Sequence, residues 1–311
     1  MTYLSFLNCI LRKEIATHTN LVVFGQNISA GSYLGGLTAG LSVPPESRII
    51  NTINAENSLV GFGFGLALSG TNAIFFMRQI DFLLLTTDQL VNTYNIIRNN
   101  PAGLPGSFTI MTTVIDQGYE GPQSSSNNLG DFCSLARIDA FTVTNKRDIE
   151  AIIPAQLVSP GFRIIAASPR LYKTDLLEPP LAYRSPTGNL FQYQEGNDTT
   201  IICFNLSFPY GYALAQAMQT KGLHPSLFSV NIPVPIKWNV ILESVKKTKK
   251  LVIFDDSKSM NCSYYALLAE ARLRFNLQKE IIITRHLGSD WLTPNSDQLE
   301  IDYQKVIKDI V

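Results

Sequence analysis

Short apolar runs alternate with helical patterns along the first 180 residues of this chain. The apolar runs are rich in Val, Ile, Leu and Phe and are bounded by Gly or polar residues, as buried strands are. The predicted strands are 21–25, 48–52, 73–77, 108–114, 141–143 and 162–167. Helices are predicted after Glu56, over 87–98 and over 148–157. Continuous apolar strands separated by helices indicate a parallel sheet that is covered on both faces.

A change of pattern separates this region from a second one. Residues 181–199 are rich in Pro, Gly, Tyr and polar side chains and have no hydrophobic period, so we expect a linker there. A second α/β series then follows, with strands at 200–205, 226–230, 251–254 and 281–284 and helices at 211–220, 238–247 and 263–275. The predicted fold class is therefore α/β, with two open α/β domains at 1–180 and 200–311.

The composition limits the classes of partner. A chain of 311 residues suits two domains of ordinary size. Charged residues make up only 16% of it, which suggests that another subunit covers part of the surface. Lys plus Arg and Asp plus Glu balance at 25 each, so we expect neither nucleic acid nor an anionic membrane as a partner.

The cysteines indicate an intracellular protein, and the histidines give no sign of a metal site. The four cysteines are far apart and never form a CxxC pair, which is typical of reduced thiols in an intracellular protein. The three histidines are scattered, which argues against zinc. We find neither a signal-peptide pattern at 1–13 nor an apolar run of membrane-spanning length, and we expect a cytoplasmic protein with no membrane segment.

Glu56 stands at the head of a glycine-rich apolar segment, 59–68. A carboxylate in such surroundings is poorly solvated, which favours its neutral form and prepares it to share a proton with a ligand. The alternative is an acidic residue near the positive end of a helix, which needs no function. The glycines at 61–65 lack the spacing of a dinucleotide-binding loop.

Four segments, taken in order, match one family. They are Gly-Gln-Asn at 25–27, the strand at 48–52 that leads to Glu56, Asp81-Phe82 with the helix at 87–92, and Gly-Tyr-Glu-Gly-Pro-Gln at 118–123. With these motifs the chain resembles the pyrimidine-binding domain of transketolase-like thiamine diphosphate enzymes, in particular the β subunit of the 2-oxoacid dehydrogenase (pyruvate dehydrogenase-type) first component. The second domain resembles the transketolase C-terminal domain, notably at 244–248.

The resemblance implies a cofactor and roles for three residues. Thiamine diphosphate would be the cofactor, with its pyrimidine half bound here. Glu56 would be the catalytic glutamate that bonds a pyrimidine ring nitrogen and favours the imino tautomer, and Phe82 would stack on the pyrimidine face. Gln26 would also bind the cofactor, at a position where the family commonly has an acid. The alternative for Phe82 is a core phenylalanine. Residues 88–92 resemble the DQ-x-x-N helix, and we expect Asp88, Gln89 and Asn92 to satisfy buried backbone groups.

A motif of the family is missing. In these enzymes a Gly-Asp-Gly with a downstream Asn binds Mg²⁺ and the diphosphate, and this sequence has none. The resemblance therefore implies that an α-type subunit carries the diphosphate and Mg²⁺ site, and that the active site lies at the interface of an α2β2 heterotetramer. A lipoyl acyltransferase would be a further partner.

The chain departs from the family where acids and bases are expected. The histidine positions are occupied by Ser124 and Ser134, and neither Ser nor Gln takes up a proton at neutral pH as His does. Gln26, Gln123 and Ser124 could instead bind a polar substrate through neutral hydrogen bonds. The alternative is a divergent subunit in which these positions are unused.

Three functions follow from the resemblance. The leading hypothesis is a β-type subunit of a heteromeric thiamine diphosphate enzyme that decarboxylates a 2-oxoacid and passes on the acyl or acyloin unit. The second is the C-terminal half of a split transketolase, which would move ketol units between sugars. The third is a non-catalytic structural subunit that retains the fold.

Overall fold

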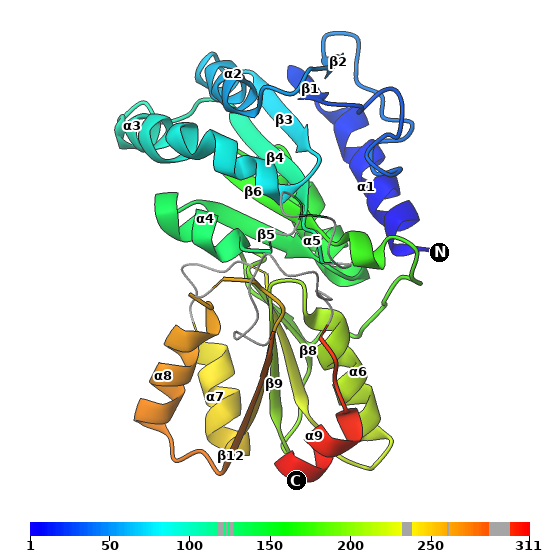
Figure 1. Ribbon diagram of the computed structural model, residues 1–311, viewed down its shortest axis with the longest axis vertical. Helices are drawn as coiled ribbons and strands as arrows, with labels where there is room; N and C mark the ends of the chain where they lie inside the picture. The colour runs from blue at the N-terminus through cyan, green and yellow to red at the C-terminus, as the bar shows by residue number, and fades with distance from the viewer. Residues whose placement is uncertain (117–120, 122–123, 125–126, 232–237, 260, 286–298) are drawn as a thin grey trace.

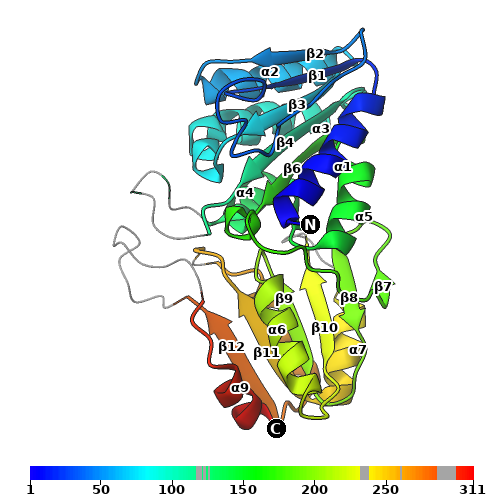
Figure 2. The ribbon, with the colours of Figure 1, turned by 90° about the vertical axis from the view of Figure 1, so that its right-hand side faces the viewer.

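The computed structural model describes the whole chain except residues 117–120, 122–123, 125–126, 232–237, 260 and 286–298. It contains two α/β domains, one above the other along the long axis of the molecule (Figures 1 and 2). Each domain has a six-stranded sheet between layers of helices. The predicted fold class is therefore confirmed.

The first sheet is parallel throughout, with the order β2-β1-β3-β4-β6-β5. Its strands are β1 (Leu21–Gly25), β2 (Arg48–Asn51), β3 (Asn72–Met77), β4 (Ser107–Thr113), β5 (Asp139–Val143) and β6 (Gly161–Ala167). All six overlap the strands predicted from the apolar runs. The carboxyl ends of parallel strands meet at one edge of the sheet, which is where α/β proteins bind their ligands.

Alternate residues of these strands face two separate helical layers. Val23 and Phe76 face α1 (Tyr3–Thr17) and α5 (Lys146–Gln156), whereas Phe24 and Phe75 face the layer on the other side. That second layer consists of α2 (Glu56–Leu68), α3 (Tyr94–Asn99) and α4 (Leu129–Ala136). Burial on both faces explains why the central strands β1 and β3 have nearly continuous apolar sequences.

The second domain is a mixed sheet with the order β12-β11-β9-β10-β8-β7. Its strands are β7 (Tyr183–Arg184), β8 (Leu190–Gln194), β9 (Thr200–Phe204), β10 (Ser226–Val230), β11 (Lys250–Asp255) and β12 (Lys279–Thr284). One face is covered by α6 (Phe208–Gln219) and α9 (Tyr303–Ile310), and the other by α7 (Asn239–Thr248) and α8 (Tyr264–Arg274). The strands β9 to β12 pair in parallel, as expected for an α/β series.

The structure corrects the expected linker at 181–199. This segment contains β7 and β8, which pair antiparallel with each other and join the second sheet beside β10. The sequence analysis missed β7 and β8 because antiparallel strands with an exposed face lack the continuous apolar sequence of a buried parallel strand.

The helical predictions also need two corrections. The segment expected as a helix over 87–98 is irregular: a 3₁₀ helix, η1 (Ile80–Thr86), precedes a π-helical turn, η2 (Gln89–Thr93), and then α3. Three helices, α1, α4 and α9, were not predicted. In α1 the signal was present, because the buried Tyr3, Leu7, Leu11 and Ile15 are spaced four apart.

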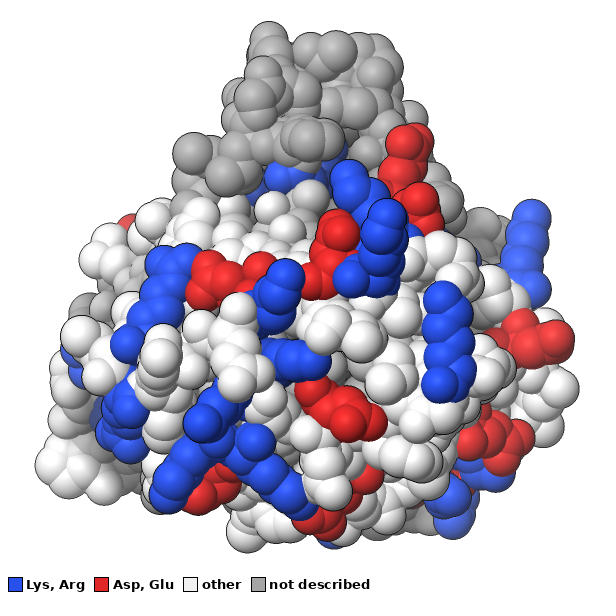
Figure 3. Space-filling view, turned by 90° about the horizontal axis from the view of Figure 1, so that it is seen from below, with Lys and Arg blue, Asp and Glu red and all other residues white. Residues whose placement is uncertain are grey.

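The outer surface of the second domain mixes charges of both signs. Seen from that end of the molecule, Lys and Arg side chains lie among Asp and Glu side chains (Figure 3). Ion pairs in this domain include Lys247 with Glu195 and Arg272 with Glu280. In the part of the chain that the structure describes, the helices are too short or too polar to cross a membrane.

Candidate functional site

Three residues singled out from the sequence come together on one pocket. Gln26 follows β1, Glu56 begins α2 after β2, and Phe82 lies in η1 after β3, so each lies just beyond the carboxyl end of a strand. The remaining lining residues are mostly apolar and are Ile53, Asn54, Leu59, Phe75, Phe76, Met77 and Arg78. The sheet therefore brings together residues that lie up to 56 positions apart in the sequence.

The glycines of α2 allow it to lie close to its neighbours. A Cβ on Gly63 would overlap the Phe108 ring of β4, whereas a Cβ on Gly61 would make an ordinary contact of 3.4 Å with the Gln89 side chain. A Cβ on Gly65, by contrast, would meet nothing within 4 Å. Of these three glycines, Gly63 is the one that close packing requires.

Glu56 lies in the first turn of α2, where a negative charge is favoured by the helix dipole. Its side chain is half-buried, and its carboxylate has no hydrogen-bond or ion-pair partner within the described residues. Phe82 is also half-buried and lines the same pocket. An aminopyrimidine ring needs a carboxyl group for a ring nitrogen and an aromatic face to stack on, and the residues present fit that group.

In this single chain the pocket has a volume of only about 10 Å³, about enough for one water molecule. Large apolar side chains beside it are left open to solvent: Ile53 is 79% exposed, and Leu84 and Leu85, which follow Phe82 in η1, are 59% and 61% exposed. The single chain thus supplies one wall of a site for a pyrimidine ring and does not enclose that site by itself.

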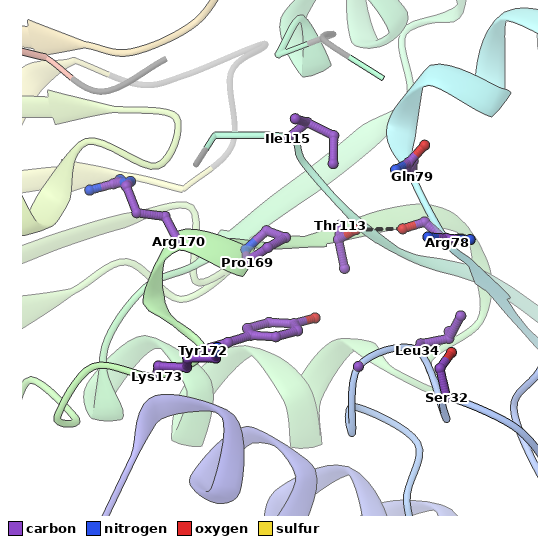
Figure 4. Close-up of a pocket in the computed structure, with 11 residues that line it drawn as sticks. Ser32, Leu34, Arg78, Gln79, Thr113, Ile115, Pro169, Arg170, Tyr172 and Lys173 are labelled. Atoms are coloured by element: carbon purple, nitrogen blue, oxygen red, sulfur yellow. Dashed lines mark hydrogen bonds between the residues drawn. The ribbon is translucent and has the colours of Figure 1, made fainter. Parts of the chain in front are cut away.

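A larger cavity of about 540 Å³ lies beside the Glu56 pocket, and Arg78 lines both. It opens at the same edge of the sheet, between the loops after β1, β3, β4 and β6 (Figure 4). It is lined by Ser32, Leu34, Gly35, Arg78, Gln79, Thr113, Ile115, Pro169, Arg170, Tyr172 and Lys173. The sequence analysis missed this cavity, because its residues come from loops without a shared motif.

One guanidinium links the two domains at the wall of this cavity. Arg170 Nε lies 3.4 Å from Asp116 Oδ2, and Arg170 Nη2 lies 3.6 Å from Asp256 Oδ2. Asp116 follows β4 and Asp256 follows β11, and both carboxyl groups are buried. Burial raises the pKa of Asp116, and it raises the pKa of Asp256 to about 7 although Arg170 acts in the opposite direction. The charge of Arg170 is therefore already matched by neighbouring carboxyl groups.

Comparison with known proteins supports one family. No family model matches the chain. The pyruvate dehydrogenase E1 component subunit beta of Staphylococcus epidermidis is 22% identical over 297 residues, which cover 94% of this chain and 91% of that protein. A structure described as a split-gene transketolase, inactive beta4 tetramer, has a TM-score of 0.65 at 18% identity and covers 90% of this chain and 87% of its own. Transketolase from Campylobacter jejuni has a TM-score of 0.66 at 12% identity and covers 91% of this chain and 42% of its own.

Sequence and fold thus agree over almost the whole length. The chain is similar in sequence and in fold to transketolase-like thiamine diphosphate enzymes. The matched region spans 94% of this chain and 91% of that pyruvate dehydrogenase subunit, so the two chains are of similar length.

Two of the positions at which this chain differs from the expected pattern, Ser124 and Ser134, have different surroundings. Ser124 donates a hydrogen bond of 3.0 Å to Gln79 Oε1, so it lies beside the larger cavity. Ser134 is exposed in α4, donates a hydrogen bond to the carbonyl oxygen of Gly130, and lines neither pocket. Gln123 lies outside the described residues.

We expected Asp88, Gln89 and Asn92 to satisfy buried backbone groups, and the structure shows other contacts for them. Asn92 donates a hydrogen bond of 2.7 Å to the carboxylate of Asp88, and both side chains are exposed. Gln89 is half-buried and lies against Gly61 of α2. These residues shape the surface of the irregular helix and its contact with α2.

Within the described ranges, no group of three or more His, Cys, Asp or Glu side chains is placed to hold a metal ion.

Proposed function

We propose that this chain is the β-type subunit of a heteromeric thiamine diphosphate enzyme that decarboxylates a 2-oxoacid and passes on the acyl or acyloin unit. The observation that carries the proposal is the convergence of Glu56, Gln26 and Phe82 on one pocket. The near-full-length likeness to a pyruvate dehydrogenase E1 component subunit beta supports the choice of a 2-oxoacid as substrate.

Each of the three residues has a distinct task in this proposal. Glu56 shares a proton with a pyrimidine ring nitrogen, and its unpartnered carboxyl group in the pocket is available for that bond. Phe82 holds the ring by stacking, and Gln26 offers a neutral amide donor and acceptor beside it. Thiamine diphosphate, when bound, supplies the carbanion chemistry that no side chain can.

The proposal includes an α-type partner that carries the Mg²⁺ and diphosphate site in an α2β2 heterotetramer. The small volume of the Glu56 pocket and the exposed Ile53, Leu84 and Leu85 around it support a covering subunit. A lipoyl acyltransferase is the proposed acceptor of the acyl unit. The four free cysteines suit the cytoplasm as the location.

The test is exchange of the thiazolium C2 proton in the complex that copurifies with this chain, followed by ¹H NMR in D₂O. Glu56→Gln keeps the shape of the side chain but cannot share the proton, so exchange should fall at least about a hundredfold. Glu150→Gln, an exposed substitution in α5, is the matched control and should exchange at the wild-type rate. Unchanged exchange in Glu56→Gln would remove the catalytic role of this residue.

The second candidate, half of a split transketolase, is favoured by the fold likeness to the split-gene transketolase over 87% of that chain. Turnover of the copurified complex with a panel of 2-oxoacids and of ketose phosphates separates the two candidates. A complex that is inactive on both panels and exchanges no proton would identify a structural subunit instead.

A further inference from the structure

The second domain lines neither pocket of the candidate site. The lining residues of the Glu56 pocket and of the larger cavity all belong to the first domain, and the last of them is Lys173. Figure 1 shows α4 directly above the second domain, and the segment between β4 and α4, which contains Ser124, makes hydrogen bonds to that domain. These bonds offer the second domain a way to act on the site from outside it.

Asn127, three residues after Ser124, makes three hydrogen bonds to the second domain. Its side-chain amide donates to the backbone carbonyl oxygen of Asp256 at 2.8 Å. Its side-chain oxygen accepts from the side-chain amide of Asn205 at 2.5 Å, and its backbone carbonyl oxygen accepts from the N–H of Lys258 at 2.6 Å. Asn127 is fully buried, so the loss of these partners would leave its amide group unsatisfied.

The side chain of Asp256 fixes Asn205. One carboxylate oxygen of Asp256 accepts hydrogen bonds from the Asn205 amide at 2.9 Å and from the backbone N–H of Leu206 at 3.0 Å. Asn205 has a φ of 58°, in the left-handed region where Asn is one of the few residue types besides Gly that is commonly found. The same amide group thus bridges Asp256 and Asn127.

A second contact holds the same segment at the start of α4. Ser259 of the second domain donates a hydrogen bond of 2.6 Å to the carboxylate of Asp131. Hydrogen bonds weaken steeply when their direction changes, and a buried network of them specifies one arrangement of its members. These polar contacts therefore fix the segment more strictly than apolar packing would.

The position of Ser124 depends on these contacts. Ser124 donates a hydrogen bond of 3.0 Å to Gln79, which lines the larger cavity. Three residues of chain span at most about 10 Å, so a displacement of Asn127 is transmitted to Ser124 over a short distance. Glu56, by contrast, begins α2 and belongs to another segment of the chain.

We propose that Asn127 and Asp256 are positioning residues, through which the second domain holds Ser124 in place beside the substrate. Asn127 acts directly on the segment that contains Ser124, and Asp256 acts through Asn205. The role of Ser124 as a residue that hydrogen-bonds the substrate rests on the proposed function. Its positioning by the second domain can be measured without any catalytic activity.

The first experiment follows the accessibility of position 124 in the full chain. Ser124→Cys in a Cys9→Ser background introduces a thiol there, and its alkylation by iodoacetamide is followed by peptide mass spectrometry. Adding Asn127→Ala or Asp256→Ala should raise the alkylation rate about tenfold, since each change leaves a buried hydrogen-bonding group without its partner. Asp256→Asn keeps the accepting oxygen and should leave the rate at that of the parent protein.

Two controls separate positioning from a general loss of structure. Asn276→Ala, exposed in the loop between α8 and β12, should leave the rate at position 124 unchanged. Cys203 is fully buried in β9 and should stay unlabelled in every variant. The positioning role is overturned if Asn127→Ala leaves the rate at position 124 unchanged, if Asp256→Asn raises it as much as Asp256→Ala, or if the labelling of Cys203 rises in parallel.

The second experiment uses the copurified complex with pyruvate. Asn127→Ala should raise the KM for pyruvate about tenfold and leave the exchange rate of the thiazolium C2 proton unchanged, because Glu56 belongs to another segment. Ser124→Ala should have the same effect, and the double variant should be no worse than either single variant, since Asn127 acts through Ser124. Additive effects would contradict this route. If the complex neither exchanges the proton nor turns over pyruvate, the proposed function fails, and the alkylation rates still decide the positioning role.

Discussion

Gly63 lies directly against the ring of Phe108. Gly63 is in the middle of α2 and Phe108 is in β4, and a Cβ on the glycine would overlap the ring. The ring is also packed by Phe64 and Phe162, with centroids 5.1 Å away in each case, so it has no room to move. This contact sets the distance between the helix that begins with Glu56 and the sheet that carries Gln26.

Gly63→Ala should therefore destabilise the chain. Overpacking a filled core costs about 1–3 kcal/mol, which exceeds the gain of up to about 1 kcal/mol from placing Ala in a helix. The measurement is the free energy of unfolding in urea. Gly65→Ala is the control two residues away, where the added methyl group meets nothing within 4 Å. That variant should be as stable as the wild type or more so, and equal losses in both variants would contradict the packing argument.

The stability of the chain should depend on the protonation of Asp256. Burial raises the pKa of this carboxyl group to about 7 in the folded chain, whereas in the unfolded chain it is about 3.9. Between these two values the folded state holds a proton that the unfolded state has lost. Stability from this group is therefore complete below about pH 4 and is lost as the pH rises toward 7.

Asp256→Asn removes this titration while keeping an oxygen to accept from the Leu206 backbone N–H at 3.0 Å. Urea unfolding of both proteins from pH 5 to pH 8 measures the difference. The wild type should lose stability relative to the variant with a slope of at most about 1.4 kcal/mol per pH unit, levelling off above pH 7. A difference that is constant over this range would mean that Asp256 does not titrate there.

The isolated chain should bind thiamine diphosphate weakly or not at all until its partner is added. The Glu56 pocket is only about 10 Å³ in the single chain, and the sequence has no Gly-Asp-Gly motif to hold Mg²⁺ and the diphosphate. Calorimetry of the chain alone, and then of the copurified complex, tests this expectation. Tight, Mg²⁺-dependent binding by the lone chain would refute the split site.

The sequence predicted the parts of the fold that depend on local pattern. The strands β1 and β3 were found because burial on both faces makes each a nearly continuous apolar run, and β4 was found from its β-branched residues. The antiparallel strands β7 and β8 were missed because β7 is exposed and because β8 pairs with β10, which lies more than 30 residues further along the chain. The π-helical turn before α3 was missed because a hydrophobic period does not distinguish it from a regular helix.

The residues of the candidate site also fall into those that the sequence predicted and those that only the structure revealed. Glu56, Phe82 and Gln26 could be named from motifs in the sequence, because each belongs to a short segment with a recognisable pattern. The cavity of Arg78 and Lys173 could not, because residues from four loops have no common pattern until the sheet brings its strand ends to one edge.

The amino-acid sequence by itself therefore determined the α/β class, the family resemblance and the presence of an acid beside a glycine-rich helix. Only the tertiary structure decided that Glu56, Gln26 and Phe82 share a pocket, that this pocket is small in the single chain, and that a positive cavity lies next to it. The physical reason is that propensity and hydrophobic period act between near neighbours in the chain. The charge, burial and partners of a site depend on residues that meet only after the chain has folded.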